Sequence, residues 1–464
     1  MSFNEKYEVL CQEVSNGLVP VTKYKSKRTG LTICLAEVEG PLVNGFFCLA
    51  TEAHDDDGLP HTLEHLIFLG SEDYPYKGVL DMMANRCLAQ GTNAWTDTDH
   101  TCYTVMTAGS QGFLNLMPVY LDHVLYPTLT DAAYVTEVHH VNGEGENAGV
   151  VYCEMQAREN SGESRCHLAM LRQMYPGHCG YKSETGGIMA NLRTSTSNDK
   201  VRDYHKSFYR PDNLCLVITG QVSAEEVFKA LDPFEEKIVS KGSLPPHTRP
   251  WMSAVPPLEA PIDQVVPYPS DDESNGLVYA AWRGPQAKDL YGMSAVSVLL
   301  EYLTDTSVAP LQRDFVEINP PANVRNSVIE ATESCIYLKF YNVPKAKLHH
   351  VKERLFQTLG NLANGTESMD MSRMKSVVHR RYWTHSIAWK TALTIHSRSC
   401  ASGTSSTGHR KRRTFHLILR IYMQLRQRLK RRGDFKKLKD EVASFWTDLL
   451  KKYFVGPPSV VRSY

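Results

Sequence analysis

The chain has 464 residues, of which 42% are hydrophobic and 22% are charged, a composition typical of globular proteins that fold into two or three domains. Its 51 lysines and arginines balance 51 aspartates and glutamates, which excludes a strong overall attraction to nucleic acid or to acidic membranes. No run of about 20 apolar residues is present, so the sequence predicts no membrane-spanning helix.

The cysteines and the N-terminal residues indicate a compartment. The eleven cysteines include no CxxC pair, a pattern that favours reduced thiols in an intracellular protein. The first residues carry Glu5, Glu8 and Glu13 and lack arginine, unlike a mitochondrial transit peptide. We therefore expect a cytoplasmic protein.

The first half of the chain alternates strand and helix signals. Residues 31–40 and 43–53 are apolar and rich in β-branched and aromatic side chains, and we expect them to be paired strands. Ser223 and Glu226 have the spacing of a capping box at the start of a helix. The other elements expected here are helices around His61 and at 78–90, 113–127, 201–209 and 223–231, two strands within 91–107, and a buried strand at 213–220.

The second half repeats this mixture after a proline-dense stretch. Residues 243–273 are expected to hold no regular structure. Beyond them we expect strands at 275–284 and 331–343 and helices at 291–303, 345–363 and 370–387. The sequence thus predicts an α+β fold used twice: a first domain at 1–245, a linker at 246–274 and a second domain at 275–464.

One segment has an anomalous composition. Residues 390–433 contain twelve lysines or arginines and no acidic residue. Three interpretations compete: a nucleic-acid or localisation patch, a solvated basic helix, or a shifted reading of the gene. We favour the last, because the sequence on both sides has an ordinary globular composition.

The stretch "GLPHTLEHLIFLG" at residues 58–70 carries the chemistry. On a helix, His61 and His65 share one face, at the spacing with which two imidazoles hold one zinc ion. Glu64 lies close to that face, where a carboxylate can act as a general base toward water. Pro60 suits a first helical position, and the acidic residues 55–57 suit the positive end of the helix.

A zinc site of this type needs a third ligand. Glu154, in the apolar segment "GVVYCEMQARE", is a candidate because a lone carboxylate there is poorly placed as a plain surface residue. The residues alone leave the choice open between Glu154 and its rivals, which are Glu137, His139, His140, Glu144 and Glu146.

Several motifs in order resemble one family. They are "GLPHTLEHLIFLGSEDYPYKG", "GTNAWTDTDHTCYTV", "GVVYCEM", "GYKSETGGIMANLRTST" and "FYRPDNLCLVITG". Together with HxxEH they resemble the pitrilysin–insulysin metallopeptidases of the inverzincin type, specifically their presequence-protease-like branch. The resemblance runs to about residue 389 and resumes near residue 435.

The resemblance implies a fold and a set of site residues. It implies two related mixed domains of the pitrilysin (LuxS/metallohydrolase-like) type, each a mainly antiparallel sheet packed with helices. It places the third ligand of one Zn²⁺ per chain on Glu154, the general base on Glu64 and, less cleanly, a supporting acid on Glu146. It also implies that a peptide is added as a strand beside Asn93 and Ala94.

The implied activity is internal cleavage of short, unstructured peptides. Members of this branch are about twice as long, and their second half supplies an Arg and Tyr pair that holds the substrate. We therefore expect weak activity from residues 1–464 alone, exposed apolar surface and self-association or a need for the C-terminal half. No nucleic-acid or membrane partner is expected, and the mitochondrial matrix is the alternative compartment. The alternative function is a non-catalytic peptidase-like subunit or binding scaffold.

Overall fold

A computed structural model describes residues 3–15, 17–266, 268–286, 288–319, 325–332, 335–395 and 431–463. Most of the basic segment at 390–433 lies outside these ranges, so its three interpretations stay open. The described chain divides into two compact units. Unit 1 consists chiefly of residues 3–157 and Ser183–Ala254, and unit 2 chiefly of Arg158–Lys182, Val255–Lys390 and residues 431–463.

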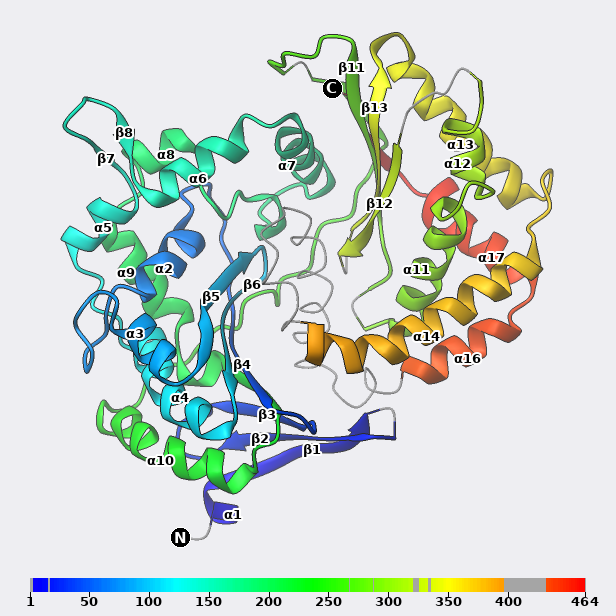
Figure 1. Ribbon diagram of the computed structural model, residues 1–464. Coiled ribbons are helices and arrows are strands. Elements are labelled where there is room, and N and C mark those ends of the chain that lie inside the picture. Colours follow the sequence, from blue (N-terminus) through cyan, green and yellow to red (C-terminus); the bar gives the residue numbers. More distant parts are fainter. Residues whose placement is uncertain are drawn as a thin grey trace. The chain divides into compact units, whose positions relative to one another are not determined.

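Unit 1 is built on a seven-stranded sheet in the order β1-β2-β3-β9-β4-β6-β5 (Figure 1). Its strands are β1 (Tyr7–Ser15), β2 (Val19–Ser26), β3 (Thr32–Glu37), β4 (Leu42–Ala50), β5 (Ala89–Asp97), β6 (His100–Ala108) and β9 (Leu214–Gly220). All neighbours are antiparallel except β3 and β9. The expected pairing of β3 with β4 is wrong, because the fully buried β9 lies between them.

Helices cover the sheet of unit 1. They are α1 (Phe3–Lys6), α2 (Leu59–Ile67), α3 (Val79–Arg86), α4 (Ser110–Leu125), α5 (Asp131–Glu137), α6 (Val150–Glu159), α8 (Met189–Thr194), α9 (Asn198–Phe208), α10 (Ala224–Ser240) and the 3-10 turn η2 (Pro211–Asn213). A two-stranded hairpin, β7 (His140–Val141) and β8 (Asn147–Ala148), lies between α5 and α6. Aromatic side chains such as Phe47, Tyr120 and Phe228 fill a core shared by the sheet, α4 and α10. The predicted capping box of Ser223 and Glu226 is confirmed.

Unit 2 is built on a five-stranded sheet in the order β10-β14-β11-β13-β12. Its strands are β10 (Ile262–Val265), β11 (Asn275–Arg283), β12 (Arg325–Thr332), β13 (Cys335–Pro344) and β14 (Ser459–Ser463). Strand β10 lies in the proline-dense stretch that was expected to hold no regular structure, and that expectation is wrong there. It forms because its main chain pairs in parallel with β14, on the side of β14 that does not face β11.

The helices of unit 2 are α7 (Gly162–Met174), α11 (Leu290–Thr304), α12 (Pro310–Phe315), α13 (Leu348–Asn364), α14 (Met371–Ile395), α16 (Arg431–Asp440) and α17 (Ala443–Leu450), with the short turns η1 (Gly180–Lys182), η3 (Lys345–Lys347) and η4 (Lys451–Val455). Helix α7 packs on β11 and β14, so residues 158–182 group with unit 2 although we placed them in the first domain. None of the helices in the described ranges is both long and apolar enough to cross a bilayer.

The two sheets repeat one topology. In unit 1, the order β3-β9-β4-β6-β5 matches β10-β14-β11-β13-β12 in unit 2, strand for strand. The first pair is parallel in both sheets, and the remaining pairs are antiparallel. Unit 1 adds β1 and β2 at one edge. The predicted fold class, two related α+β units with mainly antiparallel sheets, is therefore confirmed.

Candidate metal centre

Helix α2 follows strand β4 of unit 1 and carries the HxxEH residues. Gly58 precedes it with a left-handed φ of 69°, and Pro60 stands in its first turn as predicted. Leu63, Leu66 and Ile67 are fully buried, so the helix docks through its apolar side. His61 and His65 keep 13% and 17% of their side chains exposed, which leaves both imidazoles on the accessible side of the helix.

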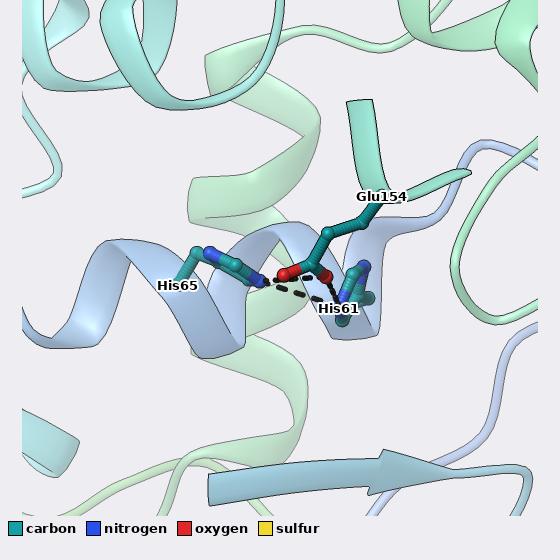
Figure 2. Close-up of side chains that lie close together, drawn as sticks. All are labelled: His61, His65 and Glu154. Atoms are coloured by element: carbon teal, nitrogen blue, oxygen red, sulfur yellow. Dashed lines mark hydrogen bonds and ion pairs between the residues drawn. The ribbon is translucent and has the colours of Figure 1, made fainter. Parts of the chain in front are cut away.

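The two histidines of α2 meet Glu154 of α6 (Figure 2). Nε2 of His61 and Nε2 of His65 lie 3.3 Å apart. Oε2 of Glu154 lies 3.3 Å from Nε2 of His61 and 3.6 Å from Nε2 of His65. Three ligand atoms from two helices thus form a nearly equilateral triangle.

This triangle fits a tetrahedral zinc ion. Ligand bonds of about 2.0–2.1 Å at tetrahedral angles put neighbouring ligand atoms roughly 3.3–3.4 Å apart. Two imidazole nitrogens and one carboxylate oxygen are also ligand types that zinc accepts in hydrolytic sites, where a fourth position stays open. The Glu154 carboxylate is half exposed, so that fourth position can face solvent.

Glu64 lies on the same helix turn but in a different environment. Its side chain is buried, and its Oε2 accepts a 2.5 Å hydrogen bond from Oγ1 of Thr96 on β5. Burial raises the pKa of the Glu64 carboxyl, while the nearby His61 and the Thr96 hydrogen bond oppose that rise. A carboxylate with a raised pKa is a stronger base, and this suits a group that accepts a proton and returns it.

A further carboxylate orients His65. Nδ1 of His65 donates a hydrogen bond to Oε1 of Glu137, over 3.1 Å, which leaves Nε2 to face Glu154. Burial lowers the pKa of His65, but the hydrogen bonds with Glu137 and Glu154 outweigh it and raise the pKa to about 9. In return, the hydrogen bonds from His61 and His65 lower the pKa of Glu154.

The structure separates Glu154 from its rivals. Glu137 contacts His65 through Nδ1, on the side of the ring away from the triangle. His139 and His140 bond to Asn147 and to the carbonyl of Val135, outside the triangle. Glu144 and Glu146 are exposed in the turn between β7 and β8, where their backbone nitrogens bond to Asn142. Of these acidic residues, Glu137 is the one with a hydrogen bond to a histidine of the triangle, at His65, whereas the contact of Glu146 is with Asn142.

Strand β5 borders the site with an open edge. It is the last strand in the sheet order and pairs with β6. Asn93 is exposed on it, opposite Thr104, while Ala94 is partly buried against the core. Sequence reasoning selected these two residues but missed Thr96, which links the same strand to Glu64. Thr96 stands within the motif "NAWTDTDH", and that position could have indicated its role beside Glu64.

Comparison with known proteins places the chain in a family. Residues 50–163 match the family model described as Insulinase (Peptidase family M16), and residues 195–377 match the model Peptidase M16 inactive domain. An uncharacterized protein of Caenorhabditis elegans is 39% identical over 455 residues, covering 97% of this chain and 44% of that protein. A mitochondrial presequence protease of Xenopus laevis is 28% identical over 345 residues, covering 70% of this chain and 32% of that protein.

Solved structures support the same fold. A protease from Helicobacter pylori superimposes with a TM-score of 0.75 at 16% identity, covering 97% of this chain and 99% of that one. The fold is that of the M16 peptidases. The chain belongs to peptidase family M16 and is similar to its presequence proteases. It spans less than half the length of the curated relatives named above.

Proposed function

We propose that this chain is a zinc-dependent endopeptidase that cleaves short, unstructured peptides. The observation that carries the proposal is the triangle of His61, His65 and Glu154, with the buried Glu64 on the same helix. In this assignment the triangle holds one Zn²⁺ and Glu64 is the general base. When bound, zinc would polarise a peptide carbonyl and lower the pKa of water.

The residues around the metal have separate tasks. Glu64 accepts a proton from water and returns it to the leaving amine, and Thr96 holds its carboxylate in one orientation. Glu137 fixes the ring of His65 so that Nε2 faces the metal position. The open edge of β5 offers backbone groups to an extended peptide, with Asn93 and Ala94 as the contacts. A peptide can extend along this edge only if it has no stable structure of its own, so the substrates are unstructured peptides.

A complete substrate site requires a second half of the protein. The relatives reported above are more than twice as long as this chain. We propose that a further M16-type half, supplied in the same chain or by association, completes the substrate site, so that residues 1–464 alone cleave peptides weakly. Loss of a single transition-state donor typically costs about 10²–10³ in rate.

A second function has one observation in its favour. The model matched by residues 195–377 describes an inactive domain, and that match includes much of unit 2. A non-catalytic subunit that binds peptides or partner proteins would use this fold without hydrolysis. Zinc content and turnover separate the two functions.

The test uses residues 1–464 as purified protein, Glu64→Gln and an exposed control, Glu353→Gln, in unit 2. Zinc is measured by atomic absorption, and hydrolysis is measured with a quenched fluorescent peptide. We expect about one zinc per chain in all three proteins and weak turnover that falls by about 10²–10⁴ in Glu64→Gln alone. Absence of bound zinc from the unaltered chain would establish the scaffold instead, and turnover retained in Glu64→Gln would reject the assigned base.

A further inference from the structure

The segment Ser183–Lys200, here called the bridge segment, contacts both helices that carry the metal-binding residues. On one side it holds the loop that leads into α2. The buried carboxylate of Asp57 accepts hydrogen bonds from Asn191, Ser195 and Lys200, at 2.8, 2.6 and 2.6 Å. Its main-chain oxygen accepts another from Thr196. The start of α2 is therefore fixed to the bridge segment.

On the other side, the bridge segment holds α6. Arg193 donates a 2.7 Å hydrogen bond to the hydroxyl of Tyr152. Leu192 is buried in one apolar cluster with Tyr152 and Met155, the residue that follows Glu154. Met155 is 2% exposed, so its side chain is packed on all sides within this cluster.

Between these two attachments lie Gly186 and Gly187. A Cβ atom on Gly58 would lie 2.6 Å from the carbonyl oxygen of Gly186, and one on Gly187 would lie 3.0 Å from Cα of Gly58. The two backbones are therefore in direct contact at the start of α2. On the opposite side, a Cβ atom on Gly186 would lie 2.4 Å from Sδ of Met155. Gly186 therefore lies in close contact with both Gly58, which precedes α2, and Met155, which follows Glu154.

We propose that Gly186 is a positioning residue for the metal centre: its missing side chain sets the separation between the histidine-bearing α2 and the glutamate-bearing α6. The inference rests on the proposed zinc site. His61 and His65 are on one helix, so their spacing is fixed by the helix itself. The distance from this pair to Glu154 depends on how closely α6 approaches, and Gly186 fills that gap. A methyl group at residue 186 would push Met155 outward, and Glu154 with it.

Gly186 is the informative position of the three glycines. Gly58 and Gly187 have φ values of 69° and 84°, so any side chain there would strain the backbone as well as fill space. Gly186 has no such positive φ, so Gly186→Ala adds a methyl group with little backbone strain. Gly143 provides the matched control, because its φ is also not positive and a Cβ there would have no atom within 4 Å.

The experiment measures zinc affinity by competition with a chromophoric chelator, and the visible spectrum of the Co²⁺-substituted protein as a readout of ligand geometry. We expect Gly186→Ala to bind zinc about 10–100-fold more weakly, as changes next to metal ligands typically do, with an altered cobalt spectrum. The affinity should fall between those of the unaltered chain and Glu154→Ala. Gly143→Ala should leave both readouts unchanged.

A double variant tests the mechanism. Met155→Ala removes the sulfur that the new methyl group would meet, so Gly186→Ala combined with Met155→Ala should recover most of the zinc affinity. Met155→Ala alone is expected to lower thermal stability and, because it loosens α6, to weaken zinc binding less than Gly186→Ala does. A general loss of folding would not be rescued by a second destabilising change.

The outcomes are distinguishable. Gly186→Ala that binds zinc as tightly as Gly143→Ala would overturn the inference, because Met155 then rotates away without moving α6. A double variant no tighter than Gly186→Ala would overturn it too. Failure of the unaltered chain to bind zinc would instead reject the proposed function on which the inference rests.

Discussion

The two units share one five-strand topology, in which β4 of unit 1 corresponds to β11 of unit 2. They differ in the helix that follows this strand. In unit 1, α2 follows β4 and carries His61, Glu64 and His65. In unit 2, α11 follows β11. Its residues are buried along almost the whole helix, and many of them are apolar, such as Leu299 and Leu303. Among the described residues of unit 2, no three side chains form a group like the one around Glu154.

The buried or partly buried carboxylates of the two helices also differ in their partners. Glu301 of α11 is paired with Arg380, over 2.7 Å, and so takes part in an ion pair. Glu64 of α2 accepts from the neutral hydroxyl of Thr96 and is buried, which raises its pKa. One topology therefore carries a candidate metal centre in one copy and a core of apolar side chains in the other. The side chains placed on the fold, and not the fold, decide which.

The largest expected effect is loss of the metal from unit 1. His65→Ala removes one of three ligands, so stoichiometric zinc should be lost and hydrolysis with it. His349→Ala, an exposed histidine in unit 2, is the control and should keep both. Metal analysis after gel filtration measures the result. Loss of zinc from His349→Ala as well would erase the distinction between the units.

A pair of core substitutions separates effects on folding stability from effects on zinc binding. Leu63 in α2 and Leu299 in α11 are both fully buried. Each change to alanine should lower the free energy of unfolding by about 2–5 kcal/mol, through lost contacts and a residual cavity. Leu63→Ala should also weaken zinc binding, because it loosens the helix that carries both histidines, whereas Leu299→Ala should not.

Urea unfolding and zinc competition on the same samples measure both quantities. Equal zinc affinity in the two leucine variants would mean that the helix packing of α2 has no influence on the metal centre.

The next expected effect is a pH dependence of metal binding. In the metal-free protein the pKa of His65 is about 9, so zinc must displace a proton at neutral pH. The zinc affinity should therefore rise with pH, by up to about tenfold per pH unit, and level off above about pH 9. Calorimetry in buffers of different ionisation enthalpy measures the released proton, and no release at neutral pH would contradict the assignment.

The stability of the metal-free protein should fall as the pH rises, whereas its zinc affinity should increase. The folded-state pKa of His65 lies above its ordinary value of 6.5. Its pairing with Glu137 and Glu154 thus contributes stability that is fully present below pH 6.5 and is lost as the pH rises through about 9. Thermal unfolding with a chelator present, against pH, measures this contribution.

The sequence by itself determined the local features. The spacing of His61 and His65 places them on one face of a helix whatever surrounds it, and the capping box of Ser223 is equally local. The β5–β6 hairpin and most helices were predictable for the same reason, since their signals lie within one stretch of chain.

Only the tertiary structure decided what meets across the chain. It inserted β9 between β3 and β4, because strand signals carry no information about which partner lies alongside. It brought Glu154 next to the two histidines. It also brought Glu137 into hydrogen-bonding contact with Nδ1 of His65, and Thr96 into hydrogen-bonding contact with Glu64. It also showed that unit 2 repeats the strand topology of unit 1. Backbone pairing and burial fix a topology that many different side chains can satisfy, whereas metal binding requires particular atoms at particular distances.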